Sequence, residues 1–500
     1  MLTINAKGRK EILGVQLDSF SRHQLTGRLP RTLDRALIFF LLLFSLTVPH
    51  SIAAAQISFI LGVVMWGLRD VALRRLHFSR SPLDRPLLAF ILLTILSSVF
   101  SVAPVISLAK TKAIGLFLVF YLVASNVSRR GAMVLVGCLA FSGLVGVGFS
   151  LMEKAVGRGM TIVSIERGSP LAAGGLQPGD VIWMAARRRV SSLDDLQSVI
   201  ASRRAGERIG IEALHAGDPI PVTLTVTEQL QARPEALGIV VDGPSRRFRV
   251  SGFSRQFLTY AEQMQILALL MLGFLLALGR RREGWWSVAA GAFFLLFVTA
   301  LLLTATRGVI LSFVLALVMV TFSVGGRKAL VLGLLAAGLI SSAGIYTVIS
   351  SRREIVARFN DDSTSRRLGY MQAGLKMIPR HPLLGVGMDS HKVYWRRWGF
   401  PGDYITHTHS TPIQLAMDRG LPALACYLWF LLAAWLMIRR QYQTARENDD
   451  LWGEAMATGA QGAILGFLFS GLTNYNFGDS ETLMLFLLVL GSARALSTYE

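Results

Sequence analysis

Three residues in the second half of the chain are suited to a transfer reaction that releases an anion. Arg307 follows Thr306 at the start of an apolar run, Arg367 lies in a polar segment, and His409 precedes Ser410. Arginine stays protonated and offers a planar fork of donors, so Arg307 and Arg367 can bind and neutralise a departing phosphate-type group. A histidine near its ordinary pKa of about 6.5 can accept a proton from a hydroxyl at neutral pH, which makes His409 a candidate general base.

Composition indicates the kind of scaffold that must hold these residues. Hydrophobic residues make up 52% of the 500-residue chain and charged residues only 16%, whereas about a quarter of a soluble domain is charged. A net charge of +20 would suggest nucleic acid binding in a soluble protein, but most Lys and Arg lie between apolar runs or in two hydrophilic segments. Cys138 and Cys426 lie inside apolar runs and form no metal or disulfide pattern. We therefore expect an integral membrane protein with no nucleic acid partner.

About twelve apolar runs approach the length of about 20 residues that a helix needs to cross a bilayer. They lie near 35–50, 52–68, 86–102, 111–127, 131–151, 258–279, 285–305, 307–324, 329–350, 412–438, 456–474 and 480–497. The expected fold class is an all-α polytopic membrane protein with about 12 transmembrane helices.

Basic residues in the short loops predict the orientation, because such loops stay in the cytoplasm. Counted from a cytoplasmic N-terminus, five basic loops all fall on the inside, namely those that contain Arg75, Arg129, Arg280, Arg327 and Arg439. Both termini are then cytoplasmic, and the segments 152–257 and 351–411 lie outside.

The first external segment alternates strand-like runs with turn signals, which suggests a compact α/β module. Ser169 and Pro170 precede the stretch GLQPGDVI at 175–182, and Ser192 caps a helix whose first turn is acidic. Over about 152–228 this pattern resembles a bacterial PDZ domain, which implies that an extended peptide adds to a sheet edge. Leu237-Gly238-Ile239 resembles a carboxylate-binding loop but lies at the far end of the module, as in a permuted arrangement. The alternative is a module that only packs on the membrane domain.

An external PDZ-like module between membrane spans also raises the hypothesis of an intramembrane metalloprotease. Such an enzyme needs a His-Glu-x-x-His helix to hold zinc. None of the eight histidines is followed by Glu, and no Gly-x-Ser-x-Gly motif stands at the head of a span. The sequence therefore argues against proteolysis and leaves a transporter or flippase as the non-proteolytic alternative.

The second external segment resembles the O-antigen ligase and polymerase family. Arg367 precedes the stretch HPLLGVG at 381–387, and His409-Ser410 is followed by nine residues and then Gly420. Thr306-Arg307-Gly308 matches a further family feature at the outer end of a span. The resemblance covers most of 286–437.

Some positions agree with the family pattern and others depart from it. Gln414 and Asp418 stand where family members often carry Gln and an acid, whereas Met371, Pro412 and Ala423 replace residues that are frequent in the family. Arg366 and Arg367 both fit the position of the family arginine, and the spacing to Pro382 favours Arg367.

The resemblance implies transfer of a glycan from undecaprenyl pyrophosphate to an acceptor hydroxyl on the periplasmic face of the bacterial inner membrane. It implies a metal-independent, inverting reaction with no cofactor and no nucleotide sugar. The implied partners are this lipid-linked donor, an acceptor that is lipid A core, another glycan or a protein, the membrane lipids, and a peptide or protein on the PDZ-like module. The implied catalytic residues are His409, Arg367 and Arg307, and the candidate substrate-binding residues are Arg366, His407, Gly385 and Gly387. The two glycines are also expected to permit a tight turn with close backbone approach.

These features divide the chain into six predicted segments. They are membrane helices 1–5 at 1–151, the PDZ-like domain at 152–230, a linker at 231–257, helices 6–9 at 258–350, the large periplasmic loop at 351–411, and helices 10–12 at 412–500.

Each candidate residue also has a plainer interpretation. Arg307 could be an interfacial arginine whose head reaches water at a span end, and Arg366 with Arg367 could be a solvated pair. His407 could only orient His409 or face water. His381 and His391 are expected at the surface, and Lys110 and Lys112 could meet either pyrophosphate or lipid headgroups. The functional alternatives to a ligase are a polymerase of the same family and a non-enzymatic polysaccharide exporter or PDZ scaffold.

Overall fold

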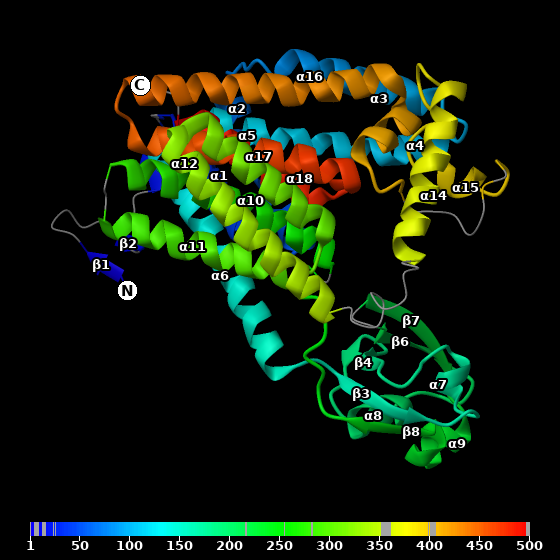
Figure 1. Cartoon of the computed structure of the whole chain (residues 1–500). Coiled ribbons are helices and arrows are strands. Elements are labelled where there is room, and N and C mark those ends of the chain that lie inside the picture. Colours follow the sequence, from blue (N-terminus) through cyan, green and yellow to red (C-terminus); the bar gives the residue numbers. More distant parts are fainter. Residues whose placement is uncertain are drawn as a thin grey trace.

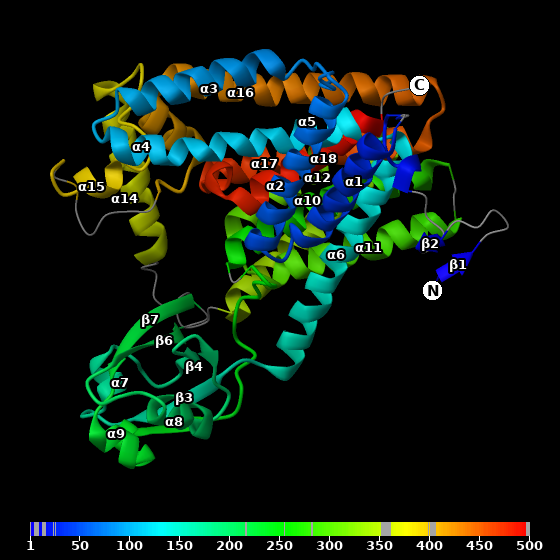
Figure 2. The ribbon, with the colours of Figure 1, turned by 180° about the vertical axis from the view of Figure 1, so that it is seen from behind.

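The computed structural model describes the whole chain except residues 1, 5–9, 13–16, 24, 26, 216–217, 255, 282–283, 352–361, 399, 401–406 and 497–500. Long helices lie side by side in one bundle, and a small sheet module projects from one end of it (Figure 1, Figure 2). The N-terminal half of the bundle comprises α1 (Arg28–Thr47), α2 (Ile52–Ala72), α3 (Asp84–Val99), α4 (Pro104–Lys110), the 3-10 segment η2 (Thr111–Phe117), α5 (Leu118–Asn126) and α6 (Arg129–Val156). The C-terminal half comprises α10 (Phe257–Arg280), α11 (Gly284–Leu303), α12 (Arg307–Ser351), α16 (Thr411–Glu447), α17 (Leu451–Thr473) and α18 (Ser480–Leu496). Two short strands, β1 (Leu2–Ile4) and β2 (Lys10–Ile12), and the turn η1 (Leu17–Ser19) precede them.

Among the described residues, nine helices are long and apolar enough to cross a membrane. Two of the nine are the halves of α12, which bends at Gly326, where φ is 68°. The other predicted spans correspond to α1, which carries charges in its first two turns, and to the shorter helices α3 and α18. The predicted polytopic helical fold is therefore confirmed, with an approximate span number.

Small residues let the central helices approach one another closely. A Cβ on Gly273 of α10 would collide with the backbone of Gly459 and Ala455 in α17. Such contacts between small residues bring helix backbones together in membranes, where packing rather than hydrophobicity drives association. As a result α10 and α17 are buried along most of their length.

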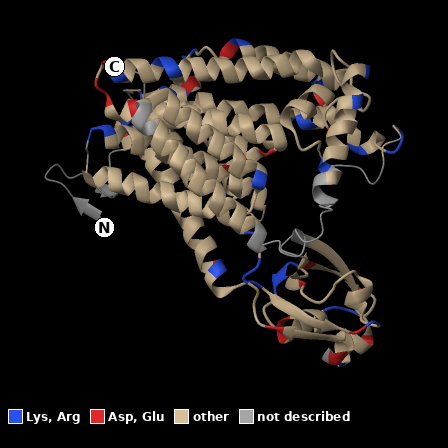
Figure 3. Cartoon of the chain, viewed as in Figure 1, with Lys and Arg blue, Asp and Glu red and all other residues tan. Residues whose placement is uncertain are grey.

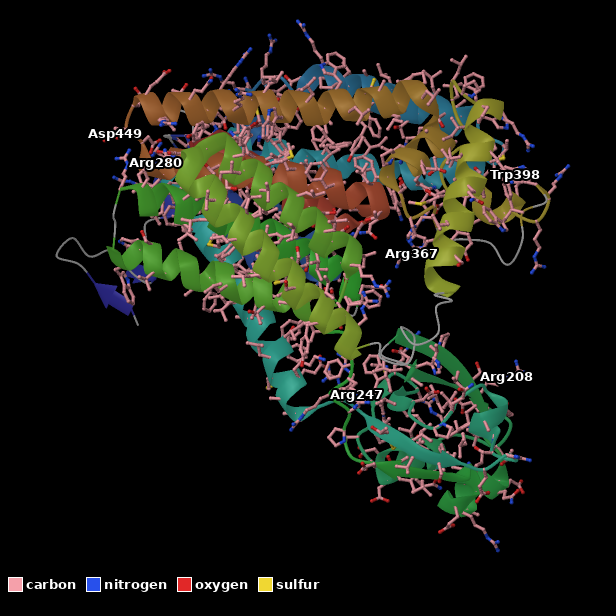
Figure 4. All side chains as sticks on the ribbon, in the orientation of Figure 1. Arg208, Arg247, Arg280, Arg367, Trp398 and Asp449 are labelled. Carbon is pink, nitrogen blue, oxygen red and sulfur yellow. The ribbon has the colours of Figure 1, made fainter. Side chains whose placement is uncertain are left out.

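The two ends of the bundle differ in character, and we name them by what they carry. At the module end, α6 stops and the chain enters the sheet module. The basic end holds Arg129 at the start of α6, Arg280 at the end of α10 and Arg439 in the last part of α16. Figure 3 shows charged residues gathered near the helix ends and on the module, with long uncharged stretches between them. Figure 4 shows Arg280 and Asp449 at the basic end, and Arg367 and Trp398 at the other.

Buried and partly buried ion pairs hold the basic end together. Arg129 binds Asp450, and Arg280 binds Glu454. Deeper in the bundle, Arg69 is fully buried between three helices. Its guanidinium donates to Asp34 at 2.6 Å, to Asp70 at 2.9 Å and to the side-chain oxygen of Asn126 at 2.6 Å. Every charge in this cluster therefore has a partner.

The sheet module is antiparallel, with strand order β7-β6-β4-β3-β8 and β5 paired to β4. Its strands are β3 (Met160–Ile165), β4 (Val181–Ala185), β5 (Arg188–Arg189), β6 (Arg208–His215), β7 (Asp218–Thr225) and β8 (Ile239–Asp242), and its helices are α7 (Pro170–Ala173), α8 (Leu193–Ala201), α9 (Glu228–Ala232) and η3 (Pro234–Leu237). Apolar side chains such as Leu196 and Ile200 form a core of its own. Strand β8 lies in the segment predicted as a linker, so the sheet extends beyond the predicted end of the module.

A narrow neck joins the module to the bundle. Arg158 and Ser245 exchange backbone hydrogen bonds of 2.8 and 3.1 Å, so the entering and leaving chains are paired. Beside this bridge, the guanidinium of Arg158 binds Glu153 at 2.6 Å and lies over the ring of Phe248. Lys154 donates to the carbonyl of Phe248 at 2.5 Å. These contacts attach the end of α6 to the chain that leads to α10.

The described part of the segment between α12 and α16, which was predicted to be external, lies at the module end of the bundle, close to α16 and α3 (Figure 1). Its described elements are α14 (Asp362–Met377), η4 (Ile378–Arg380) and α15 (His391–Tyr394). A Cβ on Gly374 of α14 would press on Ile413 and Thr408, so α14 packs directly on the start of α16.

Candidate active site

The site is built around a break in α16. At Gly420, φ is 83° and ψ is 168°, and Pro422 follows. The break allows the chain after η4 to run beside α16, where the N–H of Leu421 donates to the carbonyl of Pro382 at 2.8 Å. A Cβ at Gly420 would collide with the carbonyl oxygen of Leu383. Only glycine fits here, which explains the glycine nine residues after His409-Ser410.

Two glycines in the HPLLGVG stretch allow this stretch to pack against the broken part of α16. Gly385 has φ of 66° and its added Cβ would meet the backbone of Asp418. Gly387 has φ of 94° and its Cβ would collide with the hydroxyl of Ser101. The N–H of Gly387 donates to the carbonyl of Asp418 at 2.8 Å. Both glycines therefore satisfy a backbone requirement, as expected, and their predicted contact with substrate stays a prediction.

His409 stands in a strained conformation next to a second histidine. Its φ is 54°, in the left-handed region that non-glycine residues seldom adopt and that is enriched at functional sites. Its backbone N–H donates to Nδ1 of His407 at 3.2 Å, and the two rings lie 4.3 Å apart. Tyr370 of α14 stacks on the ring of His409, with 6.1 Å between centroids. The two imidazoles therefore lie side by side, joined by the hydrogen bond from the backbone of His409.

Burial and positive neighbours keep both imidazoles neutral. Desolvation lowers the pKa of His409 to about 3, with further contributions from His407 and Arg367. Desolvation likewise lowers the pKa of His407 to about 4, and Arg367 is the next largest cause. Arg367 therefore acts on both histidines from α14. At neutral pH each ring is unprotonated and has a nitrogen that can accept a proton.

A chain of polar contacts fixes the start of α16. The N–H of Thr408 donates to the side-chain oxygen of Gln414 at 2.7 Å, and the Gln414 amide donates to Asp418 at 2.9 Å. Nδ1 of His391 lies 3.6 Å from the other carboxylate oxygen of Asp418, too far for a hydrogen bond. The prediction that His391 lies at the surface is wrong. Its side chain is fully buried, because the loop around α15 packs against the broken part of α16.

Beside His407 the structure encloses a cavity of about 250 Å³. The polar residues of its lining include Lys110, Asp389, Lys392, His407, Asp418, Arg419 and Tyr475, and its apolar wall includes Phe90, Phe117 and Phe477. Asp389 bridges the two lysines, at 2.8 Å to Lys110 and 2.9 Å to Lys392. These lysines hold the pKa of Asp389 below its usual range in spite of burial. The lining thus carries three basic side chains against two acidic ones, together with an apolar wall.

Arg419 contributes an unusual group to this cavity. Only 6% of the residue is exposed, yet Nε and Nη1 of its guanidinium have no hydrogen-bond partner among the described residues. Its remaining nitrogen contacts the sulfur of Met388, and the group lies near the ring of Phe90. Buried donors without partners are rare and call for an explanation. Here they line a cavity with two lysines, which suits an anion.

Arg307 reaches the same end of the bundle by another route. It is the first residue of α12 and is exposed. The guanidinium of Arg249 donates to the hydroxyl of Thr306 at 2.9 Å and to the carbonyl of Thr304 at 2.7 Å, which holds the turn before Arg307. This turn includes Ala305, whose φ is 50°.

The end of α17 connects this turn to the histidines. A Cβ on Gly308 would press on the hydroxyl of Thr473. The next residue, Asn474, accepts hydrogen bonds at its carbonyl from the N–H of Thr411 at 3.0 Å and from its hydroxyl at 3.1 Å. Thr473 therefore packs against the segment that carries Arg307, and its neighbour Asn474 binds the segment that carries His409.

The remaining predicted residues lie as follows. The backbone of Arg366 belongs to α14, and its side chain lies outside the described part of the structure. Lys110 lines the cavity, whereas Lys112 is exposed and is not in the lining. No sequence pattern indicated a role for Tyr370, Asp389, Lys392, Arg419 or Tyr475. One signal was present, because Asp418-Arg419 is a charged pair inside an apolar run, and such pairs in a membrane span are functional candidates.

Comparison with known proteins identifies two domains. Residues 291–428 match the family model of O-antigen ligase, and residues 143–226 match that of the PDZ domain. A putative zinc metalloprotease of Mesorhizobium japonicum is 34% identical over 113 residues, which are 22% of this chain and 30% of that protein. The chain therefore spans less than a third of the length of this curated relative. The ligase match contains Arg307, Arg367, His409 and the cavity residue Arg419.

Both resemblances seen in the sequence are thus confirmed. The chain is a polytopic membrane protein that contains an O-antigen ligase domain and an inserted PDZ domain.

Proposed function

We propose that this protein is a glycosyltransferase that moves a glycan from undecaprenyl pyrophosphate to an acceptor hydroxyl. The observation that carries the proposal is the His407–His409 pair, which is neutral, lies within the field of Arg367 and adjoins a cationic cavity. A proton acceptor beside anion-binding groups is the set that this transfer requires.

In the proposed reaction the acceptor oxygen attacks the anomeric carbon of the donor as the bond to pyrophosphate breaks. The electron pair of that bond leaves with the lipid pyrophosphate, and the hydroxyl proton passes to the imidazole of His409. Arg367 and Arg307 neutralise the departing anion through charge-assisted hydrogen bonds. A single displacement inverts the anomeric centre. The proposal includes no metal ion, because the protein's own cations supply the neutralising charge.

Donor binding itself would prepare the base. In the free protein the pKa of His409 is about 3, which makes the imidazole a weak base. A bound pyrophosphate would offset Arg367, one cause of the depressed pKa, and an adjacent negative charge favours the protonated form. The imidazole therefore becomes a stronger base only when the donor is present.

We propose that the reaction takes place on the periplasmic face of the inner membrane, with both termini in the cytoplasm. The basic end of the bundle, which holds Arg129, Arg280 and Arg439, would face the cytoplasm according to the charge rule for short loops. The lipid-linked donor carries its own activated bond, so this compartment needs no nucleotide supply. Lipid A core and a second lipid-linked glycan are the two acceptors to compare, since they distinguish a ligase from a polymerase.

For the PDZ domain we propose that an extended peptide adds to β8. This strand is the edge of the sheet, and Val240 on it is 58% exposed. Gly238, in the left-handed conformation with φ of 60°, leads directly into the strand, as a carboxylate-binding loop would. This arrangement supports the permuted order of loop and strand.

The test is transfer from purified undecaprenyl pyrophosphate glycan by His409→Ala. We expect turnover to fall by about 10²- to 10⁴-fold, the usual contribution of a general base, while donor binding changes little. Arg367→Ala should weaken both donor binding and turnover, and Arg367→Lys should recover only part, because the fork is lost.

The matched control is His381→Ala, which removes a partly exposed histidine outside the cavity. All variants are compared only after each gives a monodisperse protein with an unchanged melting temperature. Near-normal turnover of His409→Ala would contradict the proposed base and make His407 the next residue to test.

A further inference from the structure

A second cavity lies at the basic end of the bundle, away from the candidate active site. Its volume is about 610 Å³, within the range of about 300–1,000 Å³ that is typical of small-molecule pockets. Residues of α6, α10 and α11 supply most of the lining, which includes Gly137, Ala140, Phe274, Leu278, Ala289 and Phe293. Its walls are almost wholly apolar, and the helices that form it are candidate membrane spans.

This second cavity forms a groove between the helices, and small side chains explain why the groove is open. Gly137 and Ala140 on α6 line it from one side, and Ala289 and Ala290 on α11 line it from another. A Cβ added to Gly137 would meet no atom within 4 Å. The helices are therefore separated by space that their own side chains do not fill. Within a bilayer, apolar space of this kind is filled by hydrocarbon, because water has no polar partners there.

The mouth of the groove carries a positive charge and two indoles. Arg130 lies in the first turn of α6, Trp286 in that of α11 and Trp452 in that of α17, and all three line the groove. Tryptophan is enriched at the level of the lipid headgroups. The mouth is thus at the depth where a phosphate would lie when an acyl chain occupies the groove.

Arg130 differs from the other arginines nearby. Arg129, Arg280 and Arg281 are paired with Asp450, Glu454 and Asp449, respectively. Arg130 is exposed and has no acidic partner in the part of the chain that the structure describes. One uncompensated positive charge therefore remains at the mouth.

We propose that this groove binds an anionic phospholipid, with one acyl chain between α6 and α11 and the phosphate on Arg130. The shape fits a flexible chain and the charge fits an anionic headgroup, since a basic residue near the membrane surface attracts anionic lipid. The site does not depend on the proposed transfer reaction. It lies at the opposite end of the bundle from His409, so it is separate from the cavity beside that residue.

Native mass spectrometry of the full chain in detergent tests the proposal. The protein is titrated with phosphatidylglycerol and with phosphatidylethanolamine of the same acyl chains. We expect tighter binding of phosphatidylglycerol, and Arg130→Gln should weaken it about fivefold, to the level of phosphatidylethanolamine. Gly137→Leu should lower the occupancy of both lipids, because the new side chain fills the groove.

Two control variants match these changes. Arg440→Gln removes another exposed arginine at the basic end, and Gly148→Leu enlarges another exposed glycine of α6 that has open space around it but does not line the groove. Both should bind lipid as the unsubstituted protein does. Unchanged phosphatidylglycerol binding in Arg130→Gln and Gly137→Leu would overturn the proposal. So would a change of oligomeric state in Gly137→Leu with lipid binding unaltered, since the groove would then be filled by a second copy.

Discussion

Arg69 and Arg419 are both buried arginines, but they differ in whether the donors of their guanidinium groups have partners. The guanidinium of Arg69 is enclosed by the carboxylates of Asp34 and Asp70 and by the side chain of Asn126. Arg419 is 6% exposed, and two of its three nitrogens have no partner among the described residues. The first group lies in closed packing, whereas the second lines a cavity of about 250 Å³.

This difference separates structural charge from charge that is available to a ligand. A buried ion cluster with complete partners contributes to the folded state, and breaking it leaves an uncompensated charge. A buried guanidinium with open donors costs free energy in the empty protein, and an anion would offset that cost. The comparison yields three predictions about the protein.

The largest effect is expected for Arg69→Met. The change leaves Asp34 buried without its counter-ion and leaves Asp70 with His77 as its remaining partner, which should lower the free energy of unfolding by about 3–5 kcal/mol. The measurement is the thermal midpoint of the detergent-purified protein. Arg75→Met removes an exposed arginine of the same region and should leave the midpoint nearly unchanged. Equal midpoints for the two variants would show that the Arg69 cluster is not structural.

Arg419→Met should have the opposite profile. Removing donors that have no protein partner should change the thermal midpoint little, while kcat/KM for glycan transfer should fall by about 10- to 100-fold, the value of a hydrogen bond to a charged group. The two assays are run on the same preparation. The distinction between the two arginines would be contradicted if Arg419→Met lowered the thermal midpoint as much as Arg69→Met does while its folded fraction kept normal transfer.

The smallest effect is a difference between two pH profiles. Because the free-protein pKa of His409 is about 3, the imidazole is neutral above that pH, and kcat/KM for the donor should stay level from pH 7 down to about pH 4.5. The bound pyrophosphate raises this pKa, so kcat should fall on the acid side at a pH higher by about one unit. Arg367→Gln removes one cause of the depressed pKa and should move both acid limbs to higher pH. Coincident limbs in the unsubstituted protein would contradict the proposed effect of the donor.

The sequence predicted the membrane fold and the position of the PDZ domain because both depend on local signals. Apolar run length identifies a span, and the stretch at 175–182 identifies the module. The requirement for glycine at 385 and 387 was also readable, since a tight turn with close backbone approach leaves few other choices, whereas Gly420 was noted only as part of the family pattern. These features need no knowledge of which segments meet.

The lining of the cavity could not be predicted in this way. It contains Lys110 from the first half of the chain together with Arg419 and with Tyr475 near the end of the chain. No periodic pattern in the sequence indicates that these residues lie close together. His391 was misassigned for the same reason, because a polar residue in an external loop is expected to face water. Its burial depends on the break in α16, which lets the loop pack where a straight helix would exclude it.

The paired neck between Arg158 and Ser245 has a mechanical consequence. Two hydrogen-bonded chains resist torsion better than one linker, so a partner that pulls on β8 loads both α6 and the chain leading to α10. That chain contains Arg249, whose guanidinium donates to the hydroxyl of Thr306 at the end of the turn before Arg307. We therefore expect a twist of the module to reach the turn before Arg307 through the side chain of Arg249 and through the backbone N–H of Val250, which donates to the carbonyl of Leu303 at 3.3 Å.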